Sequence, residues 1–145
     1  MSNELDGRTR LLTLFGSPIG HTNSPKMYNY CFDKMGINYI YMAFDVKKDG
    51  IAKALESMRT LNVRGGNVTM PNKKAAVELV DKLTPAARLV GAINTVITGY
   101  NTDGEGFVKN LANNDVSVVD KTITLLGSGG AGSAITAQLA LDGVK

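Results

Sequence analysis

Two adjacent lysines and one aspartate are the residues of this sequence whose types best suit proton transfer. Lys73 and Lys74 come shortly after Pro71, which predicts the start of a helix that continues to about Lys82, because proline is preferred at the first helical position. The helix dipole disfavours a positive charge at that end. A functional role would explain a lysine there, held by a carboxylate such as Asp103. The alternative is that both lysines are solvated surface residues.

Asp103 has both a chemical and a structural explanation. A lysine and an aspartate that meet over a secondary alcohol could exchange its hydroxyl proton and so act as an acid–base pair. Thr102 and Asp103 also precede an expected helix, where Thr102 could form a capping box with Glu105. The residues alone leave both interpretations open.

A glycine-rich turn stands between an expected strand and an expected helix. It consists of Gly127, Ser128, Gly129, Gly130, Ala131 and Gly132. The G-x-G-x-x-G spacing in this context is typical of dinucleotide binding, because the pyrophosphate can approach the backbone and the N-terminus of the helix. The alternative is a strand-to-helix turn without a ligand. The residue that distinguishes NAD from NADP is expected about 20 positions later, at or beyond Lys145, so the cofactor is NADP or NAD.

Strands and helices are expected to alternate along the chain. Apolar runs predict strands over residues 11–16, 39–46, 66–69, 94–97 and 122–126. Apolar spacing, prolines and glycines predict helices over 24–35, 51–61, 71–82, 86–90, 105–113 and 133–143. This alternation is typical of an α/β fold with βαβ units and a mostly parallel sheet. The polar segment 113–121 is the expected domain boundary.

Composition limits the functional class only broadly. With 145 residues, 43% hydrophobic and 20% charged, the chain is typical of a globular protein. Its net charge of +3 is spread along the sequence, so nucleic acid or a membrane is not an expected partner. No apolar run is long enough to span a membrane and no signal sequence is evident. A single cysteine, Cys31, lies in an apolar stretch and is expected to be buried. These features favour a cytoplasmic protein.

Several segments resemble, in order and character, the shikimate dehydrogenase family, and more closely its quinate/shikimate branch. They are GSPIGHTNSP (16–25), GGNVTMPNKK (65–74), GAINT (91–95) and GYNTDGEGF (99–107), followed by TLLGSGGAGSA, which resembles the cofactor turn of the family. The resemblance runs from Leu11 to the end of the sequence. It implies a substrate-binding catalytic domain over 1–113 and the first unit of a Rossmann-type NAD(P)-binding domain over 114–145, apparently truncated.

The resemblance also implies roles for individual residues. Lys73 and Asp103 would be the catalytic pair. Thr22 and Ser24 would bind the carboxylate of shikimate, with Ser24 also capping the helix that Pro25 opens. The ring hydroxyls of the substrate would be held by Thr69, Lys73, Asn94 and Asp103. The implied activity is NAD(P)-dependent reversible oxidation of shikimate in aromatic amino-acid biosynthesis, with quinate as an additional candidate substrate, by a monomer or homodimer without a metal.

Two departures from the family pattern bear on the site. Thr22 stands where the family commonly has serine, which keeps the hydroxyl and adds a methyl group. The interval between Thr95 and Tyr100 is shorter than the usual hairpin. His21 is expected to stabilise a turn rather than to act in catalysis. The alternatives are a truncated, non-catalytic module that binds shikimate-like acids, and a dehydrogenase for a related cyclic polyol acid.

Overall fold

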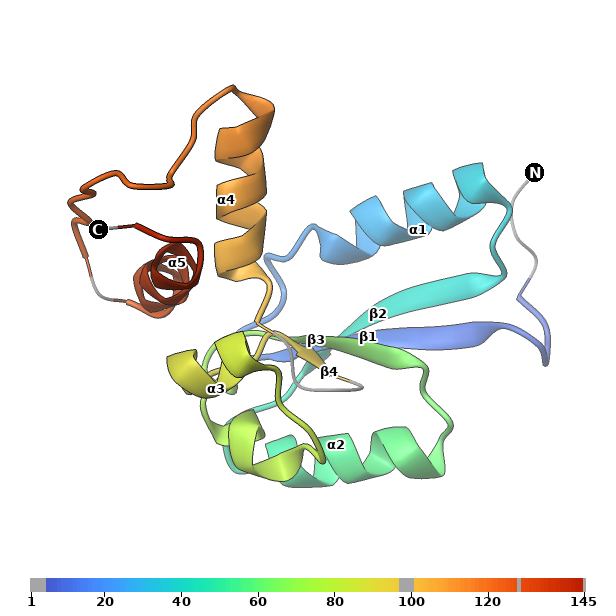
Figure 1. Ribbon diagram of the computed structural model, residues 1–145. Helices are drawn as coiled ribbons and strands as arrows, with labels where there is room; N and C mark the ends of the chain where they lie inside the picture. Colours follow the sequence, from blue (N-terminus) through green and yellow to red (C-terminus); the bar gives the residue numbers. More distant parts are fainter. Residues whose placement is uncertain (1–4, 97–100, 128, 145) are drawn as a thin grey trace.

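The computed structural model describes residues 5–96, 101–127 and 129–144 (Figure 1). In chain order the elements are β1 (Arg10–Gly16), α1 (Ser24–Met35), β2 (Tyr39–Asp45), α2 (Ile51–Thr60), β3 (Gly65–Val68), the 3₁₀ helix η1 (Ala75–Leu79), α3 (Pro85–Val90), β4 (Thr95–Val96), α4 (Asp103–Asn113) and α5 (Gly130–Leu141). Residues 97–100, which contain most of the shortened interval before Tyr100, lie outside the described ranges, as does Ser128 of the glycine turn.

The four strands form one sheet in the order β2-β1-β3-β4. β1 pairs in parallel with both β2 and β3, whereas β4 is antiparallel to β3. α1 covers one face of the sheet and α2 the other (Figure 1). The predicted α/β fold with a mostly parallel sheet is therefore confirmed. Since β4 runs in the opposite direction, Asn94, which precedes it, lies at the same edge of the sheet as the residues that follow β3.

The main hydrophobic core lies between the sheet and α2. Phe15 of β1 and Val68 of β3 point to this side and pack with Ile51, Leu55 and Met58 of α2, all of them buried. These three helical residues recur at spacings of four and three, so they share one face of the helix. Burying each side chain contributes about 1.5–3 kcal/mol before conformational entropy is counted.

The edge strand β2 is held by side chains of α1. The Asn29 amide accepts a hydrogen bond from the Tyr41 N–H at 2.8 Å and donates one to the Tyr41 carbonyl at 3.0 Å. The Tyr28 ring stacks on the Tyr41 ring with centroids 4.4 Å apart and an angle of 12° between the planes. Tyr41 therefore occupies one defined position on the α1 face of the sheet.

The predicted helix over 71–82 is wrong. A turn over 71–74 leads into the short 3₁₀ helix η1, and Val80 is already extended. In an α-helix the Lys73 carbonyl would accept from the Val77 N–H, but here it accepts from the Ile93 N–H at 3.0 Å, and Val77 donates to Lys74 instead. A tertiary contact has therefore replaced the local helical pattern.

The predicted strand over 122–126 is also absent. These residues are exposed, with Leu126 at 95%, and they pair with none of the described strands. A strand needs a neighbour to hydrogen-bond its backbone, so an apolar run alone is insufficient. The helix that follows begins at Gly130, three residues earlier than the predicted residue 133. Cys31 is exposed rather than buried, because it lies on a face of α1 that does not pack against the sheet.

Gly104 allows α4 and α5 to pack together directly. A β-carbon at Gly104 would collide with the Ala134 carbonyl and come within 2.6 Å of the Gln138 Cβ, both on α5. We expect Gly104→Ala to lower the free energy of unfolding by about 1–3 kcal/mol, the usual range for overpacking, as measured by urea denaturation. Gly106→Ala is the matched control, since a β-carbon there meets nothing within 4 Å, and it is expected to be neutral or stabilising. Equal effects of the two variants would contradict this account.

Candidate active site

An ion pair joins the turn after β3 to the start of α4. Lys73 Nζ lies 2.7 Å from Asp103 Oδ2. The two side chains are 25% and 31% exposed, so solvent or a ligand can reach them although the surrounding residues shield them partly. The pair lies at the edge of the sheet where β3 ends. The described residues contain no group of three or more histidine, cysteine, aspartate or glutamate side chains that could hold a metal ion.

Asn94 completes the set of polar groups around the carboxylate. Its Nδ2 donates to Asp103 Oδ1 at 2.7 Å, and the second carboxylate oxygen accepts from Lys73. Asn94 is itself only 9% exposed. Each oxygen of Asp103 therefore has its own donor, which defines the orientation of the carboxylate plane relative to the lysine.

Two hydrogen bonds fix the backbone at Lys73, one made by the preceding residue Asn72 and one by the Ile93 N–H. Asn72 is fully buried, and its Nδ2 donates at 2.6 Å to the carbonyl of Val46, the residue that follows β2. The Lys73 carbonyl accepts from the Ile93 N–H at 3.0 Å. The backbone that carries the lysine side chain is thus hydrogen-bonded, directly or through Asn72, to the segments that contain Val46 and Ile93.

Asn101 performs the same task for Asp103. Its Oδ1 accepts from the Asp103 N–H at 3.1 Å, and its Nδ2 donates to the Ala92 carbonyl at 3.1 Å. The expected capping box is wrong, because Thr102 makes no side-chain cap. Its hydroxyl instead lies 3.1–3.3 Å from the Asn94 amide atoms, and Glu105 pairs with Lys109.

The predicted cap at Ser24 is wrong as well. The N-cap is Asn23, which is already in the right-handed helical region and makes no side-chain cap, and Ser24 is the first helical residue. The Thr22 hydroxyl donates to Ser24 Oγ at 3.2 Å and accepts from the Ser24 N–H at 3.3 Å. Thr22 and Ser24 therefore present neighbouring hydroxyls at the N-terminus of α1.

Thr69 follows β3 directly and lies beside the end of β1. Its N–H donates to the Phe15 carbonyl at 2.9 Å. The structure thus brings Lys73, Asn94 and Asp103 into direct contact. In the part of the chain that is described, no hydrogen bond joins Thr69, Thr22 or Ser24 to these three side chains.

Two described glycines of the turn, Gly127 and Gly132, occupy positions that favour glycine. Gly127 has φ +112°, which favours glycine, and Gly129 is the N-cap of α5. A β-carbon at Gly132 would lie 2.5 Å from the Gly127 carbonyl, whereas β-carbons at Gly129 and Gly130 would meet nothing within 4 Å. At Gly132 the start of α5 therefore packs tightly against the Gly127 backbone, whereas the space beside Gly129 and Gly130 is open.

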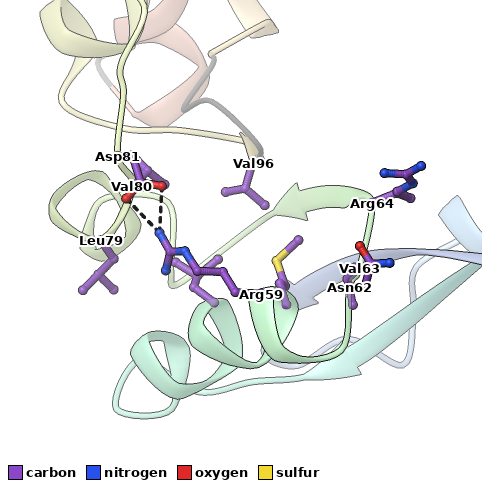
Figure 2. Close-up of a pocket in the computed structure, with 10 residues that line it drawn as sticks. Arg59, Asn62, Val63, Arg64, Leu79, Val80, Asp81 and Val96 are labelled. Atoms are coloured by element: carbon purple, nitrogen blue, oxygen red, sulfur yellow. Dashed lines mark hydrogen bonds and ion pairs between the residues drawn. The ribbon is translucent and has the colours of Figure 1, made fainter.

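Two hollows on the surface differ in their relation to these residues. One of about 680 Å³ adjoins the glycine turn and includes Gly127 and Ser133 in its lining. Another of about 350 Å³ lies between α2 and the β4 edge, where Arg59 donates to both oxygens of Asp81 at 2.9 Å (Figure 2). The second hollow contains neither Lys73 nor Asp103, so it is a separate feature.

The comparisons with known proteins agree with this arrangement. Residues 14–96 match the family model described as the shikimate dehydrogenase substrate binding domain, which is more than half of the chain. The chain belongs to the shikimate dehydrogenase family. Lys73 and Asn94 lie within the matched range, and Asp103 lies shortly after it.

Individual members of the shikimate dehydrogenase family match the whole chain. It is 48% identical to a shikimate dehydrogenase (NADP(+)) of Streptococcus uberis and 49% identical to one of Streptococcus pyogenes, and the match covers all of this chain and 52% of each relative. The chain thus spans about half the length of these curated relatives. The alignments have 153 positions, so the relatives carry at least eight residues there that the 145-residue chain lacks.

Two solved structures superpose closely on this fold. Shikimate 5-dehydrogenase from Listeria monocytogenes, crystallised with shikimate and NAD, has a TM-score of 0.96 at 42% identity. The match covers all of this chain and 52% of the Listeria protein. A 5-ketofructose reductase of Gluconobacter sp. strain CHM43 has a TM-score of 0.90 at 32% identity, over 96% of this chain and 52% of the reductase.

Two side chains that position Lys73 and Asp103 were not predictable from the sequence. They are Asn72 and Asn101: both are buried amides next to a motif residue. The one available signal was their position: Asn72 directly precedes Lys73, and Asn101 lies two residues before Asp103, each in a stretch whose composition indicates a turn. The amide of Asn72 donates to the Val46 carbonyl 26 residues away and that of Asn101 to the Ala92 carbonyl nine residues away, and neither pairing follows from a local pattern.

Proposed function

We propose that this protein is an NAD(P)-dependent shikimate dehydrogenase, which interconverts shikimate and 3-dehydroshikimate in aromatic amino-acid biosynthesis. The observation that carries the proposal is the ion pair of Lys73 and Asp103, with Asn94 on the second carboxylate oxygen, at the edge of the sheet. The names of the streptococcal relatives and the shikimate in the Listeria crystal structure support it.

Lys73 and Asp103 are proposed to handle the hydroxyl proton of the substrate. Oxidation of a secondary alcohol breaks a C–H bond and an O–H bond and forms a carbonyl. The pair accepts the hydroxyl proton in that direction and returns it in the reverse direction. Their partial exposure leaves room for a substrate hydroxyl, and the hydrogen bond between them allows the proton to be shared. The nicotinamide, when bound, accepts the hydride.

The remaining polar residues are proposed to bind the substrate. Thr22 and Ser24 present adjacent hydroxyls at the N-terminus of α1, where a carboxylate is favoured by the helix dipole. Thr69 follows β3 and Asn94 precedes β4. Both provide donors and acceptors for ring hydroxyls. A polyhydroxylated acid needs several such groups converging on it.

The glycine turn is proposed to hold NADP or NAD through Gly127, Ser128, Gly129, Gly130, Ala131 and Gly132. The turn fits a pyrophosphate because it is open at Gly129 and Gly130, where the first N–H groups of α5 are available. The relatives carry NADP(+) in their names and the Listeria structure holds NAD, so both cofactors are retained in the proposal.

A second candidate keeps the chemistry and changes the substrate. The fold also superposes on a 5-ketofructose reductase, which favours testing a keto sugar beside shikimate and quinate. We further propose a cytoplasmic protein that acts as a monomer or homodimer on a small molecule, without nucleic acid or membrane. Among the described residues no helix has the length and apolar character needed to cross a membrane.

The deciding experiment is a steady-state assay of the full-length protein. Shikimate, quinate and 5-ketofructose are each tested with NAD(H) and NADP(H), and we expect the highest kcat/KM with shikimate. Preference for the keto sugar would favour the second candidate. Binding of shikimate in calorimetry without turnover on any pairing would instead indicate a binding module and would overturn the proposed activity.

Ser24→Ala tests the proposed carboxylate site. Loss of a hydroxyl that bonds a charged group is expected to raise the KM for shikimate about tenfold, with a smaller change in kcat. Because Ser24 makes no helix cap, the free energy of unfolding should change by less than about 0.5 kcal/mol. Ser57→Ala, on exposed α2 surface away from the site, is the control. An unchanged KM would place the carboxylate elsewhere.

A further inference from the structure

A continuous chain of side-chain hydrogen bonds crosses the α1 face of the sheet and ends at Asp103. The Tyr41 O–H on β2 donates to Asn67 Oδ1 on β3 at 2.8 Å. Asn67 Nδ2 donates to Thr95 Oγ1 on β4 at 3.3 Å and to the Asn94 carbonyl at 3.2 Å. Thr95 then donates to Asn94 Oδ1 at 3.0 Å, and Asn94 donates to Asp103 Oδ1 at 2.7 Å. We refer to this series as the Tyr41–Asp103 chain.

All donors in the Tyr41–Asp103 chain point the same way. If the Asn67 amide were reversed, its oxygen would face the Asn94 carbonyl and repel it, and its NH₂ would face the Tyr41 hydroxyl. The Asn94 carbonyl, which can only accept, therefore fixes Asn67 with Nδ2 toward β4, and the Tyr41 O–H supplies the donor that Asn67 Oδ1 needs in that orientation. Asn67 Nδ2 is then available to Thr95, and the Thr95 O–H to Asn94.

The same logic determines the Asn94 amide. Its Oδ1 accepts from the Thr95 hydroxyl and from the Thr102 N–H at 3.3 Å. The Thr102 N–H can only donate, so it requires the oxygen on that side, and the Thr95 hydroxyl donates to the same oxygen; Nδ2 therefore faces the carboxylate of Asp103. Lys73 then meets the other carboxylate oxygen.

Tyr41 is suited to be the fixed end of the chain. It is 2% exposed, its ring is stacked on Tyr28 and its backbone is bracketed by Asn29. Burial, with a smaller contribution from Tyr28, raises the pKa of the Tyr41 phenol well above its ordinary range. The hydroxyl thus keeps its proton and remains a donor.

We propose that Tyr41 is a positioning residue for the Lys73–Asp103 pair, acting through Asn67 and Thr95 on the Asn94 amide without touching the substrate. This inference rests on the proposed dehydrogenase function. It assigns a role in turnover to a side chain on β2, separated from Asn67 on β3 by the intervening strand β1.

The first test is Tyr41→Phe, which removes the hydroxyl and keeps the stacked ring. Loss of one orienting hydrogen bond is expected to lower kcat for shikimate about three- to tenfold in the full-length protein, with a smaller change in KM. Tyr39→Phe is the matched control, since Tyr39 lies on the same strand and its ring packs against Phe32. A Tyr41→Phe enzyme with unchanged kcat would overturn the proposal.

A double-mutant cycle separates positioning from a general structural effect. Thr95→Val breaks the chain and should lower kcat by a similar factor, while Thr95→Ser keeps the hydroxyl and should restore it. In the Thr95→Val background Tyr41→Phe should add little, because the two residues act in series. Multiplying losses in the double variant would overturn the proposal, and the Thr95 pair of variants provides the test if Tyr41→Phe does not fold.

A third measurement tests the Tyr41–Asp103 chain by a signal that does not depend on turnover. The side-chain amide signals of Asn67 and Asn94 in ¹⁵N NMR should move, and their protons should exchange faster, in Tyr41→Phe but not in Tyr39→Phe. If these changes occur in a protein that does not oxidise shikimate, the proposed function fails and the positioning role stands. If shikimate is oxidised normally and the Asn94 signals do not change, the positioning role fails and the proposed function stands.

Discussion

Lys73→Ala is expected to lower kcat for shikimate oxidation by about 10² to 10⁴ fold, the range for a positioned acid–base group. The reason is geometric: Lys73 Nζ lies 2.7 Å from Asp103, and alanine removes the amine while the hydrogen bond from the Ile93 N–H to the backbone carbonyl at position 73 remains. The free energy of unfolding should change little, because the ion pair is partly exposed and such pairs contribute little to stability. Steady-state kinetics and circular dichroism measure the two effects.

Lys74→Ala provides the control for that variant. Lys74 is adjacent in sequence and exposed, so it shares the local charge and turn but not the contact with Asp103. We expect it to retain kcat within about twofold, as is usual for exposed surface substitutions. Near-normal turnover in Lys73→Ala, or an equal loss in Lys74→Ala, would remove Lys73 from the mechanism.

Asp103→Asn should lower kcat by about 10² fold or more, because it removes the negative charge that holds Lys73 while preserving the size of the side chain. The amide also places an NH₂ group against either Asn94 Nδ2 or Lys73 Nζ, both of which are donors. One of the two donors therefore loses its acceptor. The expected loss is measured as kcat and KM for shikimate with the preferred cofactor.

Two comparisons make the Asp103 result specific. Glu105→Gln changes an exposed acid in the same helical turn, which pairs with Lys109, and should leave kcat nearly unchanged. The Lys73→Ala and Asp103→Asn double variant should be little worse than the poorer single variant, because groups that act as a unit are strongly non-additive. Independent, multiplying losses would show that the two residues do not act together.

Local signals in the sequence were sufficient where a helix has both ends marked. Pro25 and Gly36 predict a helix over 24–35, and α1 has those bounds, with Gly36 in the left-handed region at φ 64°. Pro71 carries the same signal but opens only a turn, because Ile93 takes the carbonyl that a helix would use. A marker at the start of a helix thus has less weight than a tertiary hydrogen bond.

The site was only partly predictable for a related reason. The motifs name Lys73, Asn94 and Asp103, and their meeting depends on β4 running antiparallel to β3, which returns Asn94 to the edge where β3 ends. No periodicity predicts that direction for a strand of two residues. The hydrogen bond between Tyr41 and Asn67 depends on register across three strands, so it becomes visible only in the assembled sheet.

The bracket that Asn29 forms around Tyr41 has a consequence for the behaviour of the protein at high concentration. An edge strand offers unpaired backbone groups to which the strand of another molecule can add, and this addition is a common start of aggregation. In β2 the outward N–H and C=O of Tyr41 are already occupied by a side chain of the covering helix. An incoming strand would have to displace α1 to pair there, so this position interrupts intermolecular sheet growth along β2.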